Sequence, residues 1–342
     1  MKNLLLATWL IAFCGIAQAA TLKIATVTPE GSEWMRQMRA GASEIQERTD
    51  GRVQIKIYGG GVQGNDSKVL GKIRIGALHG GAFTPTALAD IYPDINLYGL
   101  PMVFASEEEA AYVRERMDEK LQAGLEEAGF VSFGFAAGGF ASIMSNTPVR
   151  SLDDLRSKRV WIPEGDALSY ASLQAVSLSP VTLPLTDVLT GLQTGLIDIV
   201  GVSPIGALVL QWHTKVDYMT DMPLSYTYGF MAIDKRAFSR LSEGDQAVVR
   251  EVMTALYDEF DEENLVDNRE ARESLLKRSM ELVEFDAEEE ANLRQLVEQT
   301  NRQLGKDGAF SIELYNEMMG HVRDYREAHR NGTGGVAQTA VD

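Results

Sequence analysis

Short apolar runs alternate with amphipathic stretches through the first quarter of the chain. The apolar runs alternate in polarity as strands do, whereas the longer stretches place apolar side chains at helical spacing. The predicted elements are strands over 22–27, 52–58 and 76–84 and helices over 33–48 and 65–75. This strand–helix–strand–helix–strand order predicts a mostly parallel sheet covered by helices.

The middle of the chain also alternates between predicted strands and helices, and the residues that end these elements are clearer. Ser151 and Asp154 resemble a capping box, and Pro163 ends the strand after them. Thr186 is predicted to cap a short helix that ends at Gly195. The predicted elements are helices over 106–129, 166–177 and 187–194 and strands over 130–136, 141–146, 160–162 and 196–200.

The last third is predominantly helical. A strand over 225–233 precedes a very long charged helix that Ser242 is predicted to cap. Two more helices are predicted over 287–304 and 311–329. Strands near 140 and 230 that carry the chain between two lobes would form a hinge, which lets a cleft open and close around a ligand.

The N-terminus is typical of an export signal. Lys2 precedes an apolar stretch from Leu4 to Ile16, and residues 17–19 read Ala-Gln-Ala, a small-x-small cleavage pattern. The alternatives are a membrane anchor, for which the stretch is short against ~30 Å of hydrocarbon, and a lipoprotein site at Cys14. Cleavage near Ala19 would remove Cys14, which is the only cysteine, so we expect a periplasmic protein without disulfides.

Charge and motif content argue against several function classes. The formal net charge of −17 disfavours nucleic acid and anionic membrane surfaces as partners, and we interpret it as promoting solubility. The four histidines lack metal-ligand spacing, and no nucleophile elbow occurs. Gly59, Gly61 and Gly64 match G-x-G-x-x-G, but the next predicted strand ends without an acidic residue. We therefore predict no enzyme activity, no metal and no cofactor.

Six segments, taken in order and spacing, resemble the solute-binding proteins of tripartite ATP-independent periplasmic (TRAP) transporters, the DctP-like family. They are TDGRVQIKIYGGGVQGND, GKIRIGALHGG, LPMVFAS, NTPVRSLDDLRSKRVWIP, SPVTLPLTDVLTGLQTGLID and YTYGFMAIDKRAFSRLSEGDQ. The resemblance implies an α/β fold of the two-lobed periplasmic binding protein type (type II-like). It also implies a central cleft, hinge strands and a long helix spanning both lobes.

The resemblance also implies a domain division. We expect a signal peptide over 1–19, a discontinuous first lobe over 20–140 plus 232–275, a second lobe over 141–231, C-terminal helices packing on the lobes over 276–330, and a disordered tail over 331–342. No other segment is apolar and long enough to insert into a membrane, and the long helix shows no exposed apolar stripe, so we expect a monomer.

Proteins of this family capture a small organic solute by cleft closure and deliver it to small and large integral membrane subunits, without chemistry. The usual ligand carboxylate is held by an Arg at a strand end, and that position here is Trp161. Indole has one donor and no charge, so we expect a neutral, aromatic or otherwise non-standard solute in place of a C4-dicarboxylate. Arg159, two residues earlier, could substitute for the missing Arg, or it could be a surface cation.

Candidate ligand-binding residues lie at strand ends and lobe crossings, where open α/β sheets bind ligands. They are Glu33, Trp34, Phe83, Thr84, Phe140, Arg159, Trp161, Glu164, Ser203, Trp212, Tyr226 and Tyr228. Three have structural alternatives: Trp34 as core, Trp212 as lobe packing, and Glu33 as an acid favouring a helix start. A second function class is a periplasmic ligand sensor that feeds a receptor kinase.

Overall fold

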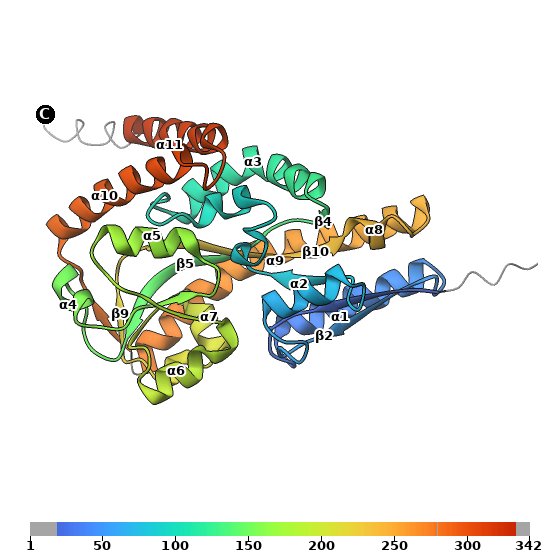
Figure 1. The fold of residues 1–342 in the computed structure, drawn as a ribbon, viewed down its shortest axis with the longest axis horizontal. Coiled ribbons are helices and arrows are strands. Elements are labelled where there is room, and N and C mark those ends of the chain that lie inside the picture. The colour runs from blue at the N-terminus through green and yellow to red at the C-terminus, as the bar shows by residue number, and fades with distance from the viewer. Residues whose placement is uncertain (1–18, 279, 333–342) are drawn as a thin grey trace, which may run out of the picture.

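The computed structural model describes residues 19–278 and 280–332 and shows two α/β lobes side by side (Figure 1). A nine-stranded sheet has the order β11-β9-β5-β10-β3-β1-β2, with β4 pairing to β10 and β8 to β5, and β6 and β7 form a second sheet. The strands are β1 (Ala20–Ala25), β2 (Val53–Tyr58), β3 (Gly80–Phe83), β4 (Phe130–Ser132), β5 (Ala136–Ser145), β6 (Trp161–Pro163), β7 (Val181–Leu183), β8 (Ile199–Val202), β9 (Tyr218–Thr220), β10 (Ser225–Asp234) and β11 (Glu281–Val283).

Helices cover both lobes. The α-helices are α1 (Glu33–Arg48), α2 (Asp66–Arg74), α3 (Glu107–Glu127), α4 (Leu152–Arg156), α5 (Ala167–Ala175), α6 (Val188–Thr194), α7 (Pro204–Val209), α8 (Lys235–Phe238), α9 (Glu243–Arg278), α10 (Ala287–Lys306) and α11 (Ile312–Gly332). The 3₁₀ segments are η1 (Pro85–Leu88), η2 (Pro93–Gly99), η3 (Leu185–Asp187) and η4 (Trp212–Thr214).

The first lobe follows the predicted strand–helix alternation. Strand β1 pairs in parallel with β2 and with β3, whereas β10 joins β3 antiparallel, so the complete sheet is mixed. The Ser32 hydroxyl accepts the amide of Met35 and starts α1, and Asn65 accepts the amide of Lys68 and starts α2. The predicted helix starts in this lobe are confirmed.

The second lobe confirms one predicted cap and corrects another. Ser151 accepts the Asp154 amide at the start of α4, as expected. Thr186 does not cap α6, because a 3₁₀ turn over Leu185–Asp187 precedes the helix and makes Asp187 its first flanking residue. Gly195 ends α6 at φ 69°, a left-handed conformation that glycine adopts without steric cost.

The buried apolar residues separate into one large cluster in the first lobe and two smaller clusters in the second. Within β5 the division falls between Ala137, which packs with the first lobe, and Ile143, which packs with the second. Within the returning strand, Tyr226 already packs with the first lobe. The second crossing therefore lies near Leu224, earlier than the predicted boundary after residue 231.

The paired strands β5 and β10 cross between the lobes at a bulge. Thr227 is opposite Gly139, but the next residue, Tyr228, is opposite Ala137, so Gly138 has no partner. Gly139 has φ 74°, and a Cβ added there would lie 2.1 Å from the Asn268 amide nitrogen of α9. The hinge is thus a glycine bulge held by the long helix.

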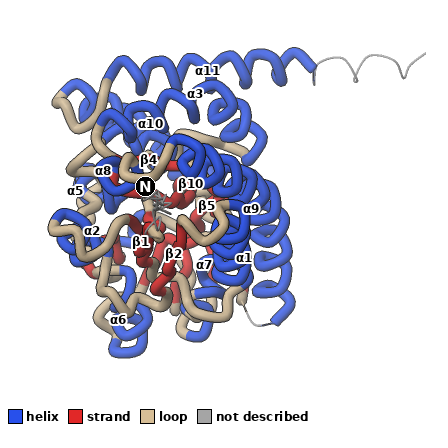
Figure 2. The backbone as a smooth tube through the Cα atoms, turned by 90° about the vertical axis from the view of Figure 1, so that its right-hand side faces the viewer, coloured by secondary structure: helices blue, strands red, loops and turns tan. Residues whose placement is uncertain are grey.

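Helix α9 runs along both lobes. It packs on α1 in the first lobe, on the crossing strand β5, and on α7 in the second lobe (Figures 1 and 2). Asn268 accepts a hydrogen bond from the Ile205 amide of α7 at 3.2 Å. One helix therefore contacts the crossing strand and both lobes.

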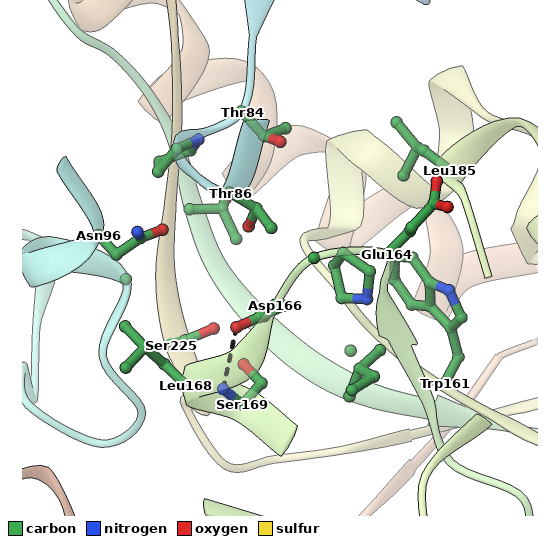
Figure 3. Close-up of a pocket in the computed structure, with 18 of the residues that line it drawn as sticks. Thr84, Thr86, Asn96, Trp161, Glu164, Asp166, Leu168, Ser169, Leu185 and Ser225 are labelled. Atoms are coloured by element: carbon green, nitrogen blue, oxygen red, sulfur yellow. Dashed lines mark hydrogen bonds between the residues drawn. The ribbon is translucent and has the colours of Figure 1, made fainter. Parts of the chain in front are cut away.

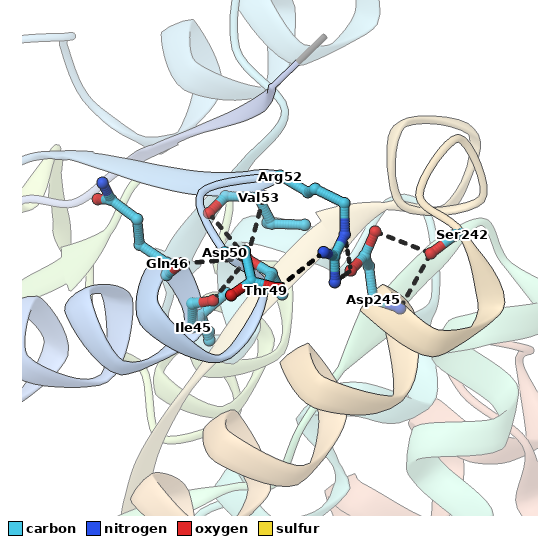
Figure 4. Close-up of polar contacts among 8 residues, drawn as sticks. All are labelled: Ile45, Gln46, Thr49, Asp50, Arg52, Val53, Ser242 and Asp245. Atoms are coloured by element: carbon cyan, nitrogen blue, oxygen red, sulfur yellow. Dashed lines mark hydrogen bonds and ion pairs between the residues drawn. The ribbon is translucent and has the colours of Figure 1, made fainter. Parts of the chain in front are cut away.

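The start of α9 is fastened to the first lobe by a small polar cluster (Figure 4). Arg52 donates to Asp245 from Nε at 3.1 Å and from its terminal nitrogen at 3.0 Å. Ser242 accepts the Asp245 amide, which confirms Ser242 as the cap of the long helix, and its hydroxyl donates to the Asp245 carboxylate at 2.8 Å. The Thr49 hydroxyl accepts from the Val53 amide and orders the turn next to this cluster.

The two C-terminal helices pack on different lobes. Helix α10 contacts α5 of the second lobe, and α11 contacts α3 of the first lobe. Helix α11 continues through Gly332, two residues into the segment predicted as tail. The predicted signal peptide, up to residue 18, and the remainder of the predicted tail lie outside the described residues.

The two lobes also meet at the mouth of the space between them. Asn65, which caps α2, donates from Nδ2 to Oε2 of Glu164 in the second lobe at 2.8 Å. The same Asn65 side chain accepts the Lys68 amide through Oδ1. One amide therefore both starts a first-lobe helix and latches that lobe to the other.

Replacing Gly139 with alanine should destabilise the protein by about 1–3 kcal/mol, because the new Cβ meets Asn268 and the backbone is left-handed. Gly244→Ala, in the first turn of α9 where an added Cβ meets nothing within 4 Å, is the matched control and should be neutral or stabilising. Urea denaturation of both variants measures the change in the free energy of unfolding. Equal stability of the two variants would contradict the hinge description.

Glu164→Ala should lower the closed population of the unliganded protein roughly five-fold, since one solvent-exposed hydrogen bond contributes about 1 kcal/mol. Cleavage of the expected signal leaves no native cysteine, so Val62→Cys and Leu196→Cys, both exposed, can carry spin labels on opposite lobes. Distance distributions between the labels measure the closed fraction. Glu164→Gln keeps an acceptor oxygen and should behave like the parent; an unchanged distribution in Glu164→Ala would exclude the latch.

Candidate functional site

A cavity of about 690 Å³ lies between the lobes and is lined by both of them. Its first-lobe wall comes from α2 and the segments η1 and η2, and its second-lobe wall comes from β6, α5 and β8. The hinge strand β10 contributes the floor at Tyr226 and Tyr228. The volume suits a small organic molecule.

Seven of the twelve residues predicted from the sequence line this cavity: Thr84, Trp161, Glu164, Ser203, Trp212, Tyr226 and Tyr228. Ser203 has a structural role: its hydroxyl accepts a hydrogen bond from the Gly206 amide and caps α7. The Glu164 carboxylate accepts from Asn65 at the mouth. The four aromatic members are themselves buried, so they form the wall behind the cavity and expose little ring surface to it.

Trp161 presents its ring, and not its donor, to the cavity. Its indole Nε1 donates to the carbonyl oxygen of Leu183 at 3.0 Å. Its ring meets that of Trp212 edge to face, with centroids 5.2 Å apart. Figure 3 shows Trp161 beside Glu164 and Leu185 on the second-lobe side. With its single N–H already paired, Trp161 offers a ligand apolar and π contact only.

Tyr226 and Tyr228 are held from behind by a buried polar network. Arg114 of α3 donates to the Tyr226 hydroxyl at 3.0 Å, to Asp261 of α9 at 2.6 Å and to Asp118 at 3.0 Å. Tyr228 donates to the carbonyl oxygen of Ile95. Burial raises the pKa of Tyr226 to about 12, so its hydroxyl stays protonated. The network fixes the floor of the cavity to α3 and α9.

The other five predicted residues lie outside the cavity lining. Phe83 is buried in the first-lobe core, and Trp34 stacks on Phe260 at 5.4 Å, which is the core alternative for that residue. Phe140 is half-buried and packs edge to face on Tyr226. Glu33 is exposed and pairs with Arg36 of the same helix.

Arg159 also lies outside the cavity, which corrects the strand argument made for it. Strand β6 begins only at Trp161, so alternation does not extend back two residues to place both side chains on one face. Arg159 instead donates to Asp198 from Nε at 2.8 Å and from its terminal nitrogen at 2.7 Å. It is an exposed cation paired with Asp198.

The sequence analysis missed most of the polar lining. The missed side chains include Asn65, Asp66, Thr86, Asn96, Asp166, Ser169 and Ser225. Figure 3 shows Thr86, Asn96, Asp166, Ser169 and Ser225 around the same space, with Asp166 accepting the Ser169 amide at 2.9 Å. In the sequence, Asp66 and Asp166 lie at the starts of the predicted helices over 65–75 and 166–177. Both begin a helix soon after a strand, and that position could have identified them as cleft residues.

The cavity is acidic. Four carboxylates line it, on Asp66, Asp90, Glu164 and Asp166, against one basic side chain, Arg74. Burial raises the pKa of Asp66 to about 6, and burial also raises the pKa of Asp166 although the Ser169 amide opposes the shift. Arg74 is exposed at the end of α2. A ligand here meets more negative than positive charge.

The described part of the chain contains neither a candidate metal site nor a candidate membrane span. Residues 19–278 and 280–332 hold no group of three or more His, Cys, Asp or Glu side chains placed to bind a metal ion. Among those same residues, no helix combines the length and apolar character needed to cross a bilayer.

Comparison with known proteins gives remote but consistent relatives. The chain is 25% identical to the 2,3-diketo-L-gulonate-binding periplasmic protein YiaO of Escherichia coli K12 over 62% of this chain and 65% of that one. It is 22% identical to the uncharacterized protein YiiZ of Salmonella typhimurium over 45% of this chain and 48% of that one. The alignments thus span about half to two thirds of these relatives.

Structural similarity is more extensive. The sugar acid binding protein DctPAm of Advenella mimigardefordensis, solved with galactonate, superposes with a TM-score of 0.82 at 17% identity, covering 90% of this chain and 99% of that one. This likeness confirms the predicted two-lobed fold. The model of the DctP family, bacterial extracellular solute-binding protein family 7, matches residues 24–307. The chain therefore belongs to bacterial extracellular solute-binding protein family 7, the family whose solved members include the TRAP periplasmic solute-binding proteins.

Proposed function

We propose that this protein is the extracytoplasmic solute-binding component of a TRAP-type secondary transporter. In this role it captures a small organic solute as the two lobes close, and it delivers that solute to membrane subunits. The main observation in support is the cavity, because residues of both lobes and of the crossing strand β10 line it. A solute bound there touches every part that moves when the lobes close, so binding and closure are coupled.

We further propose that the solute is a neutral, aromatic or otherwise non-standard compound and not a C4-dicarboxylate. One relative is named as a 2,3-diketo-L-gulonate-binding protein, and another was solved in complex with galactonate; both compounds are sugar acids. In this chain Trp161 replaces the usual Arg, and its N–H is already bonded to Leu183. A bidentate Arg–carboxylate contact contributes about 1.5–3 kcal/mol, and nothing at Trp161 supplies it.

A thermal-shift screen of the purified protein tests this function. A ligand present at one hundred times its Kd adds about 2.7 kcal/mol of stability, which is readily measured. We expect stabilisation by a neutral or aromatic solute and none by succinate, malate or fumarate. Strong stabilisation by those dicarboxylates, with no neutral or aromatic compound active, would refute the ligand class.

Two variants extend the same screen. Trp161→Phe keeps an aromatic wall and loses only an N–H that faces Leu183, so it should keep most of the affinity for the solute identified. Trp161→Ala removes the wall and its contact with Trp212, and should weaken binding strongly.

A further inference from the structure

One apolar cluster of the second lobe surrounds part of the cavity. This cluster, which includes Leu155, Ile199 and Val297, has twelve buried members, and all of them except Val149 and Phe285 line the cavity. In the other second-lobe cluster only three of thirteen members do so. Protein cores normally pack without voids larger than a water molecule. This cluster instead borders a space between α4, β8 and α10, which we call the side chamber of the cavity.

Helix α5, which also lines the cavity, has an apolar face that protein covers only in part. Of its residues Ala167–Ala175, only Ser172 is buried, whereas a helix on a protein surface normally buries its apolar side chains. Leu168 and Leu173 are half-buried and line the cavity. The Ser172 hydroxyl lies on the same face and has no hydrogen-bond partner among residues 19–278 and 280–332. The packing of α5 is therefore incomplete on its cavity side.

Aliphatic side chains with accessible surface line the cavity from both lobes. Ile91 of the first lobe is 38% exposed, and Leu70 of α2 is half-buried. On the second lobe, Leu152 of α4 and Leu185 of η3 are half-buried and line the same space. A ligand therefore reaches hydrocarbon surface on both sides, although the aromatic side chains behind it are buried.

Uncharged polar groups line the region between the lobes. Figure 3 shows Thr84, Thr86, Asn96 and Ser225 around this space. The Thr84 hydroxyl makes no capping bond to η1, and Asn96 uses its Nδ2 to donate to the carbonyl oxygen of Pro93 at 3.2 Å. In contrast, none of the cluster members that border the side chamber is ionisable. The cavity thus has a polar region between the lobes and an apolar region within the second lobe.

We propose that the solute carries an aliphatic group that enters the side chamber, while its polar group stays between the lobes near Thr86, Asn96 and Ser225. The inference rests on the proposed solute-binding function and specifies its ligand class. Apolar cavities bind hydrocarbon groups readily because they hold no ordered water that must be displaced. A solute with a hydroxyl on every carbon would instead bury polar groups against hydrocarbon, which is costly.

A series of straight-chain alcohols tests the side chamber directly. 1-Propanol, 1-butanol, 1-pentanol and 1-hexanol share one hydroxyl group and differ only in the number of methylene groups. Tryptophan fluorescence titrations should show binding that tightens roughly two- to four-fold with each added methylene, until the chamber is filled. Sorbitol, which has six carbons and six hydroxyl groups, is the matched polar control and should bind at least ten-fold more weakly than 1-hexanol.

Matched variants assign the chain-length effect to the side chamber. Ser172→Leu adds hydrocarbon on the buried face of α5 and should weaken 1-hexanol binding roughly ten-fold, with less effect on 1-propanol. Ala175→Leu places the same side chain at an exposed position of the same helix and should bind like the parent. Ser172→Ala removes only the unpaired hydroxyl, so it should keep the chain-length series. Melting temperatures verify that all three variants are folded.

Several results would overturn the proposal. Affinity that does not rise with chain length, or tighter binding of sorbitol than of 1-hexanol, would show that no apolar group enters the cavity, and this result needs only the parent protein. Equal binding of 1-hexanol by folded Ser172→Leu and Ala175→Leu would place the effect outside the side chamber. The solute-binding function is decided separately, by the screen of neutral, aromatic and dicarboxylate compounds, and would stand with a different ligand class.

Discussion

The pairing of β5 with β10 is the constraint on which the rest of the structure depends. These two strands join the lobes, and β10 also supplies the aromatic floor of the cavity. Their register breaks at Gly138, and Gly139 next to it takes a left-handed conformation against Asn268 of α9. The irregular pairing that joins the lobes is therefore continuous with the lining of the cavity.

Helix α9 and the buried network around Arg114 define which parts of this arrangement are rigid. Arg114 links α3, α9 and Tyr226 through charged hydrogen bonds, and such pairs are costly to break when buried. At its start α9 is fixed to the first lobe through Asp245 and Arg52. Helix α9 is therefore tied to both lobes, through Arg52 in the first and through the Ile205 amide in the second.

Local chemistry made much of the fold predictable from the sequence. Caps at Ser151 and Ser242 and the stop at Gly195 are confirmed because each depends on the residues beside it. The predictions that Thr186 caps a helix and that Arg159 lines the cavity were wrong, because neighbouring structure determines both positions. A 3₁₀ turn precedes α6, and Asp198, far along the chain, holds Arg159 away from the cavity.

The site was harder to predict than the fold for the same reason. Trp161 could be placed from the family resemblance, but the use of its N–H depends on Leu183 of a neighbouring strand. Asp66 and Asp166 look like ordinary helix starts in the sequence. Only the packing of two lobes brings both to one cavity with a single basic residue at its edge.

The most direct test of this account is a crystal structure of the protein with the solute that co-purifies from its native periplasm. The account predicts a solute that is not a C4-dicarboxylate, bound in the cavity beside Trp161, with the lobes joined at Asn65 and Glu164. A C4-dicarboxylate in the cavity, with one carboxylate paired to Arg74, would contradict it.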